Sequence, residues 1–372
     1  MKYLSLILFA IFLLPGTLTA QHSHEHGRVI EFPDIPGYQT LKCDFHIHTV
    51  FSDGSVWPNI RVQEAIRDGL DAISLTEHIE YQPHADDIPH PDRNRSYEIA
   101  MEEAEGHDLI IVHGAEVTRD MPPGHSNAIF ITDANRLQDD DPLTVFREVK
   151  RQGGFVFWNH PNWTAQRPNG VASLTDLHRQ LIDEKLLHGI EVVNDVTYSD
   201  EALQIALDNN LTIVGTSDIH GLVDWQYEVP EGGHRPIMLV FAEERSEAGI
   251  KEAMIAGRTA AYYQNQLIGK AAYVKPLIEA SVVVKEASYN GDSSVIAVEL
   301  ENNSDMHLIL KNTSDFTLHN SSGVVTIESH HSETIHVKTL DRLDAFSLTF
   351  EVLNAITAPN VHASITVDVA VE

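Results

Sequence analysis

Cysteine, basic side chains and long apolar runs are all scarce in this 372-residue chain, and each scarcity excludes a class of protein. Cys43 is the only cysteine, so the chain has no intrachain disulfide and no thiolate zinc finger. Lys and Arg number 25 against 55 Asp and Glu, a formal net charge of −30. Such acidity disfavours tight binding of nucleic acid, which needs a basic face. It also repels small anions unless bound cations reverse the local field.

No apolar run reaches the roughly 20 residues that a transmembrane helix requires. The N-terminal run, Leu4 to Leu14, follows Lys2 and precedes small residues that end at Ala20. This is the pattern of a cleavable signal peptide over residues 1–20, so we expect a secreted or periplasmic protein. Residues 21–37 form a polar N-terminal segment.

Residues 38–268 alternate short apolar runs with amphipathic stretches, the pattern of βα units around a parallel sheet. We expect strands near 41–47, 71–75, 109–117, 126–131, 155–158, 190–193, 211–216 and 237–241. Helices are expected near 58–68, 95–105, 142–152, 174–186, 199–209 and 246–256. Repeats of this kind indicate an α/β barrel. An open doubly wound sheet gives the same alternation, but the first strand lacks the Gly-rich phosphate loop of nucleotide-binding folds.

Residues 276–372 change to β-branched alternation broken by Asn, Asp, Ser and Gly. Strands are expected near 281–285, 295–300, 324–328, 346–353 and 362–371. Short strands at near-regular spacing are typical of a small all-β, immunoglobulin-like sandwich. This segment carries no catalytic constellation, so we expect it to be structural or to bind a glycan or a protein surface.

Residues of the metal-binding types follow the predicted strands of the first domain. His46 and His48 alternate along the first strand, so their side chains share one face, and Asp218 and His220 repeat this spacing later. Because strand ends of a βα barrel open on one face, ligands from separate strands would gather in one mouth. The candidate metal ligands are His46, His48, Asp53, His78, Glu116, His125, His160, Asp218 and His220.

Five ordered motifs between residues 40 and 265 resemble those of the polymerase and histidinol phosphatase (PHP) phosphoesterases. They are His46-x-His48, Thr76-Glu77-His78, Glu116, His160 and Asp218-x-His220, with Asp53 and His125 at the remaining family positions. The resemblance implies a distorted (β/α)7 TIM-like barrel, a trinuclear metal centre and phosphoesterase activity. Many relatives carry a histidine where this chain has Asp53.

The resemblance also implies three metal sites, two of which share Glu116 as a bridge. The first comprises His46, His48, Glu116 and Asp218, the second Glu116, His125 and His160, and the third Asp53, His78 and His220. Imidazole and carboxylate ligands suit zinc, manganese or iron, so up to three such divalent ions are expected. No protein nucleophile is expected. The catalytic group would be a metal-bound water with its pKa lowered to about 7, bridged or oriented by Glu116 and Asp218.

Three further residues are candidates for contact with the substrate phosphate. Arg119 comes three residues after Glu116, and His234 and Arg235 follow two glycines. A guanidinium that reaches the barrel mouth would fork onto a phosphate.

A multinuclear centre does not by itself name the bond that is cleaved. The expected substrate is a phosphate ester, either a small molecule or linked to a polymer. A metal-dependent hydrolase of a phosphotriester, lactone or sulfate ester fits the same residues. The non-enzymatic alternative is a glycan-binding or partner-binding protein whose metal-loaded barrel is a scaffold.

Overall fold

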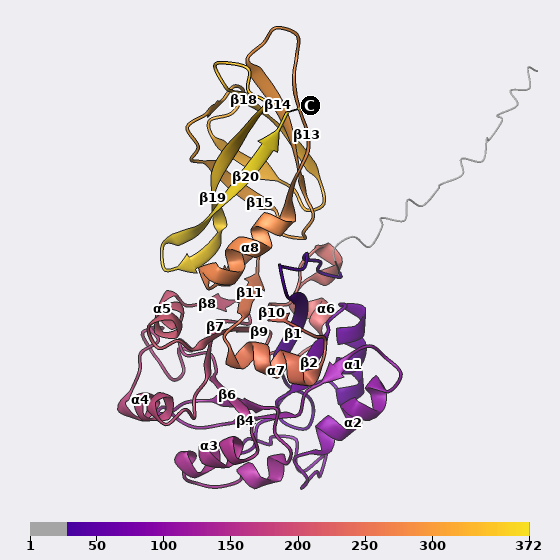
Figure 1. Cartoon of the computed structure of the whole chain (residues 1–372). Helices are drawn as coiled ribbons and strands as arrows, with labels where there is room; N and C mark the ends of the chain where they lie inside the picture. The colour runs from indigo at the N-terminus through magenta and orange to yellow at the C-terminus, as the bar shows by residue number, and fades with distance from the viewer. Residues whose placement is uncertain (1–27, 372) are drawn as a thin grey trace, which may run out of the picture.

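The computed structural model of the chain describes residues 28–371. The expected signal peptide and residues 21–27 of the polar segment lie outside the described residues. Figure 1 shows an α/β domain with a β-sandwich above it, and helix α8 (Ala271–Ser281) connects the two. Within residues 28–371, every helix is too short or too polar to span a bilayer.

Several helices of the first domain begin at a capping side chain. Asp141 caps α3 by accepting the backbone N–H of Thr144. Ser199 and Ser246 cap α5 and α7 in the same way. The α-helices before α8 are α1 (Pro58–Arg67), α2 (Arg95–Ala104), α3 (Pro142–Arg151), α4 (Asp176–Asp183), α5 (Asp200–Asp208), α6 (Val223–Gln226) and α7 (Glu247–Ile255), and two 3-10 turns are η1 (Ala134–Leu137) and η2 (Val229–Glu231).

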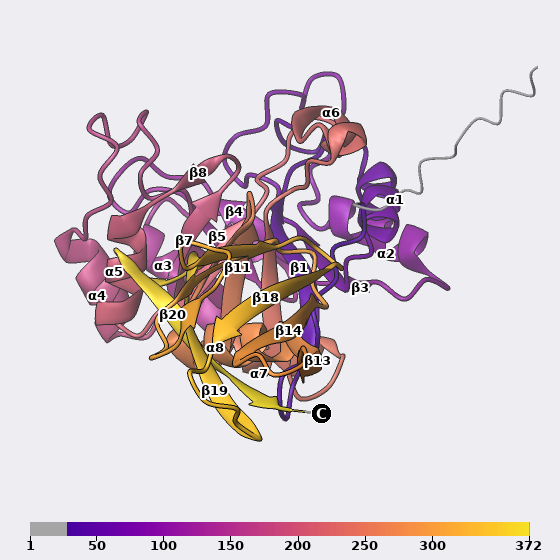
Figure 2. The same cartoon turned by 90° about the horizontal axis from the view of Figure 1, so that it is seen from above.

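Two sheets form the centre of the first domain. One has the order β12-β11-β10-β1-β2-β3, and the other has the order β4-β5-β6-β7-β8 with β9 also paired to β7. Seen from above, helices flank these strands, with α1 and α2 on one side and α4 and α5 on the other (Figure 2). The strands are β1 (Gln39–Ile47), β2 (Ala72–Leu75), β3 (Ile110–Ile111), β4 (Gly114–Val117), β5 (Ser126–Ile129), β6 (Phe155–Trp158), β7 (Gly189–Asn194), β8 (Thr197–Tyr198), β9 (Thr212–Thr216), β10 (Ile237–Ala242), β11 (Thr259–Tyr263) and β12 (Gln266–Gly269).

Isolated backbone bridges connect the two sheets into a distorted barrel. One bridge pairs His78 with Glu116, and another pairs Ile47 with Ile219. His78 and Glu116 are candidate ligands themselves, while Ile47 and Ile219 each lie between two candidate ligands. The candidate ligands therefore sit where the two sheets meet.

The barrel is not an unbroken series of parallel βα units. Strand β5 runs antiparallel to β4 and β6, and β10 runs antiparallel to β1. Residues 118–125 are too few for a crossover helix, which needs a dozen residues or more, so the chain reverses between β4 and β5. His125 precedes β5 and therefore lies at the same end of the sheet as Glu116 in β4.

The second domain is a sandwich in which inward and outward residues alternate clearly along β14 and β20. One sheet has the order β13-β14-β18-β16, and the other contains β17, β15, β19 and β20. The strands are β13 (Val282–Tyr289), β14 (Val295–Asn302), β15 (Leu308–Asn312), β16 (Thr317–Leu318), β17 (Val324–Ile327), β18 (Ser332–Lys338), β19 (Ala345–Ala358) and β20 (Val361–Ala370). The predicted fold class, a distorted α/β barrel followed by a small immunoglobulin-like sandwich, is confirmed.

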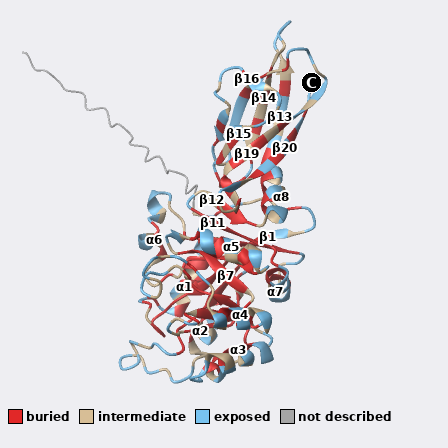
Figure 3. Ribbon diagram, turned by 90° about the vertical axis from the view of Figure 1, so that its left-hand side faces the viewer, coloured by how far each residue is buried: buried red, intermediate tan, exposed pale blue. Residues whose placement is uncertain are grey.

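The two domains share a sheet and an apolar core. Strand β12 of the barrel pairs in parallel with β19 of the sandwich, with Leu267 opposite Ala355. One buried cluster extends from Leu239 in the barrel, through Leu277 in α8, to Phe350 in the sandwich. Figure 3 shows buried residues continuing from one domain into the other. The barrel and the sandwich therefore depend on each other for burial.

Removal of residues 282–372, which leaves α8 intact, should make the barrel insoluble or strongly lower its thermal unfolding midpoint. The reason is that the deletion exposes the paired edge of β12 and the apolar side of α8. The full-length protein without residues 1–20 is the control. A truncated protein that matches its solubility and unfolding midpoint would contradict the shared core.

Candidate metal centre

Strand β1 brings two imidazoles to one end of the barrel. The side chains of His46 and His48 are fully buried, and their Nε2 atoms lie 3.0 Å apart. The separation follows from their i, i+2 spacing at the end of an extended strand, which turns both side chains to one face.

The loop after β9 brings a carboxylate to the same two rings. Asp218 Oδ1 lies 3.1 Å from Nε2 of both His46 and His48. Asp218 has a φ of 51°, in the left-handed region that Asp tolerates better than most residues. Two residues on, Nδ1 of His220 donates to the Asp218 carbonyl at 2.7 Å. The Nε2 atom of His220 then faces Asp53, whose Oδ1 lies 3.1 Å away.

Glu116 lies at the centre of the cluster and is fully buried. Its Oε2 atom lies 3.5 Å from His46 Nε2, 3.3 Å from His48 Nε2 and 3.0 Å from His78 Nδ1. Its Oε1 atom lies 3.0 Å from His125 Nδ1 and 3.8 Å from His160 Nε2. The two oxygens of one carboxylate therefore face different sets of imidazoles.

The structure brings all nine candidate ligands together. Three groups have ligand atoms within 4.8 Å of one another: His46, His48 and Glu116; His78, Glu116 and His125; and His48, Asp53, His78 and His220. Asp218 and His160 lie against members of these groups through the contacts given above. In this arrangement His48 is near both the first and the third implied sites. Their role as ligands stays a prediction.

Burial and nearby charges shift the pKa values of these side chains in opposite directions. Burial lowers the pKa of His46, but nearby carboxylates, that of Asp218 above all, outweigh burial and raise it well above its ordinary value. Burial lowers the pKa of His48 to about 3, and His78 adds to this effect. The pKa of Glu116 falls well below its ordinary value despite burial, because protonated His78 stabilises the carboxylate. An ionised Glu116 and a neutral His48 are in the forms that bind metal.

Several buried ligand atoms make no hydrogen bond. Among residues 28–371, these atoms include Asp53 Oδ1, Glu116 Oε2, His125 Nδ1, His160 Nδ1 and Asp218 Oδ1. A buried polar atom without a partner costs roughly 1–3 kcal/mol, so five in one cluster need an explanation. Imidazole nitrogens and carboxylate oxygens facing one another are a donor set suited to zinc, manganese or iron. The residues present therefore fit the divalent ions that the sequence motifs imply.

Comparisons with known proteins support both domains. A family described as an Ig-like domain matches residues 282–368, and no curated protein matches the chain. A solved structure from Bacteroides vulgatus ATCC 8482 is a two-domain protein containing a predicted PHP-like metal-dependent phosphoesterase. It is 43% identical, with a TM-score of 0.86, and the match covers 92% of this chain and 98% of that one. The chain belongs to the PHP-like family.

Two other solved structures resemble parts of this PHP-like chain. One, from Bifidobacterium adolescentis ATCC 15703, is described as a metal-dependent phosphoesterase and is 19% identical, with a TM-score of 0.37 over 48% of this chain and 87% of that one. The other is an amidohydrolase from Chromobacterium violaceum with bound sulfate and no metal. It is 15% identical, with a TM-score of 0.35 over 55% of this chain and 99% of that one.

Glu191 is a buried carboxylate beside the PHP-like centre that the sequence analysis missed. Its Oε1 atom lies 2.7 Å from Nδ1 of His46, and its Oε2 atom accepts the backbone N–H of His160 at 2.6 Å. Because a carboxylate only accepts, His46 carries its proton on Nδ1 and presents Nε2 to the cluster. The available signal was a lone acidic residue inside the apolar run of β7.

Two other polar residues hold the ligands in place. Asn159 donates to Oε1 of Glu116 at 2.8 Å, which fixes the central carboxylate. Glu77 accepts the hydroxyls of Thr49 at 2.5 Å and Ser52 at 2.6 Å. These bonds anchor the loop after β1 that carries Asp53.

Glu191→Gln should weaken zinc binding by about 10- to 100-fold, the loss typical of removing a carboxylate that orients a ligating histidine. The amide keeps the shape but supplies only one acceptor oxygen, so His46 loses its fixed orientation. Competition with a chromogenic chelator measures the affinity. Glu201→Gln, an exposed glutamate on α5, is the control. Unchanged zinc affinity in Glu191→Gln would contradict the orienting role.

The three predicted phosphate contacts do not join the cluster. Arg235 is buried, with Nη1 3.2 Å from Asp44 and Nη2 2.7 Å from Asp68, so the prediction that it reaches substrate is wrong. Its guanidinium is needed inside the fold because those two carboxylates are themselves buried and require a counter-charge.

The other two candidates have different surroundings. His234 stacks on Tyr262, with ring centroids 4.7 Å apart, and lines a cavity that contains none of the candidate metal ligands. His234 therefore lies apart from the cluster, and its contact with substrate stays a prediction. Arg119 pairs with Glu80 at 2.8 Å, and its contact with substrate stays a prediction.

Proposed function

We propose that this PHP-like protein is an exported metal-dependent phosphoesterase. Its substrate would be a phosphate ester, small or polymer-linked, hydrolysed at a centre of up to three divalent ions of zinc, manganese or iron. The observation that carries this proposal is the convergence of nine imidazole and carboxylate side chains at one end of the barrel. The Bacteroides vulgatus relative, described as containing a predicted metal-dependent phosphoesterase, supports the reaction class.

The proposed ligand sets are those implied by the family motifs, with Glu116 shared between two of them. Divalent ions bound here would acidify a water molecule to a pKa of about 7 and neutralise charge on the phosphoryl oxygens. Other side chains of the protein hold the proposed ligands in position. Glu191 fixes the ring of His46, and Asn159 holds Glu116 between the two sets of imidazoles. Because these supports are buried, the ligand atoms are arranged before substrate arrives.

Exposed aromatic rings beside the cluster offer contacts for the leaving group. Trp163 is 44% exposed, and its ring centroid lies 5.6 Å from that of His125 and 5.1 Å from that of His160. Tyr81 is 52% exposed and lies 5.7 Å from His78. Flat rings of this kind bury apolar ligand surface at little cost in conformational freedom. A phosphate ester with an organic leaving group therefore fits this site better than inorganic phosphate, which has no group to contact the rings.

Export and the domain limits are also proposals, supported by the sequence pattern. We propose a signal peptide over residues 1–20, a hydrolase domain over 38–268 and a sandwich domain over 276–372. N-terminal sequencing of protein expressed with its own leader should give a chain beginning at Gln21, recovered outside the cytoplasm. An intact Met1 in a cytoplasmic fraction would contradict export.

Asp218→Ala should reduce kcat/KM on the preferred phosphate ester by at least about 100-fold, because removing a ligand costs more than removing an orienting partner. The assay uses zinc- or manganese-loaded protein on matched chromogenic phosphate monoesters, diesters and triesters. Asp208→Ala, at an exposed position at the end of α5, is the matched control and should retain full turnover.

The same assay, extended to a chromogenic lactone and a sulfate ester, separates the alternatives. Metal-dependent turnover of only a phosphotriester, lactone or sulfate ester would replace the phosphoesterase with another ester hydrolase. Absence of turnover on every ester by metal-loaded protein would contradict an enzymatic role and favour the scaffold alternative.

A further inference from the structure

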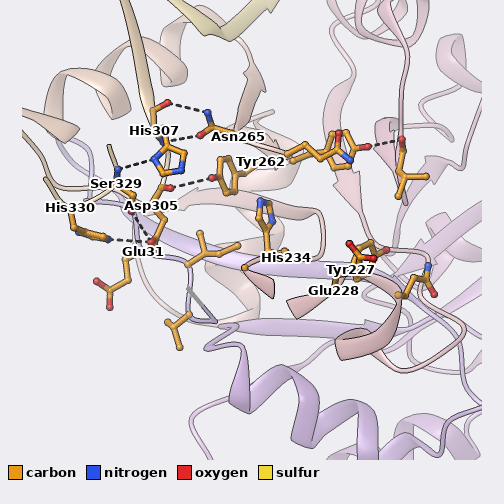
Figure 4. A pocket seen from close by; sticks show the side chains of 18 of the residues that line it. Glu31, Tyr227, Glu228, His234, Tyr262, Asn265, Asp305, His307, Ser329 and His330 are labelled. Atoms are coloured by element: carbon orange, nitrogen blue, oxygen red, sulfur yellow. Dashed lines mark hydrogen bonds and ion pairs between the residues drawn. The ribbon is translucent and has the colours of Figure 1, made fainter. Parts of the chain in front are cut away.

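A large cavity lies where the barrel meets the sandwich (Figure 4). Its volume is about 1120 Å³, at the upper end of the size range of ligand pockets. Its walls come from the N-terminal segment at Val29–Glu31, the end of α6, the turn between β11 and β12, and the sandwich loops near 305–307 and 329–331. None of the nine candidate metal ligands lines it.

The buried wall of this cavity, which we call the junction cavity, is aromatic and rigid. Tyr227, Tyr262 and Tyr263 are buried, and their hydroxyls donate to the backbone carbonyls of Ser217 at 2.7 Å, Asp305 at 3.4 Å and Val196 at 2.6 Å, respectively. His234 stacks on Tyr262 with an interplanar angle of 3°. The rings are thus fixed in advance, which lowers the ordering cost of binding.

The exposed rim of the junction cavity is polar and carries both donors and acceptors. Glu31 and Glu228 supply carboxylates, Gln264 supplies an amide, and His330 and His331 supply imidazoles. Among residues 28–371, no Lys or Arg lines the cavity. The rim therefore surrounds a buried aromatic wall with hydrogen-bonding groups and no fixed positive charge.

These features select one chemical class of ligand. Carboxylates on the rim and at Asp305 repel an anion, so the junction cavity is unsuited to a phosphate group. A small cation would pair with the carboxylates but leave the amide and imidazole donors unmatched and most of the volume unfilled. Hydroxyl groups donate and accept at once, so they match the mixed donors and acceptors of the rim. The partly exposed imidazole of His234 offers an aromatic ring on which the C–H face of a sugar packs. We propose that the junction cavity binds a short, uncharged oligosaccharide.

One hydrogen bond links the wall of the junction cavity to the loop that carries the candidate ligand Asp218. The Tyr227 hydroxyl donates to the carbonyl of Ser217, the residue before Asp218. If the substrate is a polymer-linked ester, which rests on the proposed function, a bound saccharide would be held beside the centre that hydrolyses the ester. Saccharide binding itself needs no metal and no turnover, so it is tested separately.

Isothermal titration calorimetry of the full mature chain tests this proposal. The probes are neutral tetrasaccharides built from glucose, mannose, xylose or N-acetylglucosamine, with an oligogalacturonide as the anionic comparison and spermidine as the cationic one. Ser329→Trp places a bulky ring into the cavity, and Ser288→Trp makes the same change on the outer side of β13 as a control. His234→Ala removes the ring stacked on Tyr262. Its control is His113→Ala, because His113 stacks on Tyr97 away from the cavity.

We expect at least one neutral tetrasaccharide to bind, with at least a tenfold loss of affinity in Ser329→Trp and His234→Ala and none in the two controls. Thermal unfolding midpoints establish that all variants are folded, and binding should survive treatment with a chelator. Failure of every neutral probe to bind would overturn the proposal. Binding of spermidine or the oligogalacturonide alone would overturn it as well, and so would neutral binding that Ser329→Trp leaves unchanged. Loss of ester turnover with retained saccharide binding would contradict only the proposed function.

Discussion

The rest of the structure depends on a single buried carboxylate, Glu116, placed among imidazoles from several strands. A carboxylate without solvent is stable only beside positive charge or hydrogen-bond donors, and Asn159 supplies one such donor. The crowding of ring nitrogens around it, with the Nε2 atoms of His46 and His48 3.0 Å apart, would be favourable with divalent cations bound by these ligands. The cluster is therefore a stability constraint as well as the candidate metal centre.

The two sheets of the first domain meet at the cluster, and this meeting places Glu116 among the imidazoles. His78 and Glu116 form one backbone bridge between the sheets, and Ile47 and Ile219 form another. A ligand displaced at either bridge would disturb the contact between sheets, so ligand geometry and barrel closure are coupled. The sandwich extends this framework because β19 continues the sheet that contains β1.

Much of this arrangement was predictable from sequence, because period-two spacing and strand-end position are local properties. The local backbone sets how the two side chains of a pair lie. This holds for His46 and His48 on a strand and for Asp218 and His220 on a loop. The reversal of β5 was visible only as a short connection. Strand β18 was missed because only Ile335 and Val337 in it are apolar, and β15 was missed because its apolar run, Leu308 to Leu310, is very short. Arg235 was misassigned because sequence does not reveal which distant carboxylates, here Asp44 and Asp68, need a buried partner.

The junction cavity shows a further limit of sequence patterns, since its walls come from segments far apart in the chain, from Glu31 to His331. No local motif marks such a place, whereas the shape of the folded chain does.

The proposed function requires that the cluster hold metal. Mass spectrometric quantification of zinc and manganese in the mature protein, after loading and dialysis against buffer without chelator, tests this most directly. We expect two or three bound ions per chain. This number should be lower in His46→Ala and unchanged in the exposed control His107→Ala. Less than one ion per chain in correctly folded protein, under every loading condition, would contradict it.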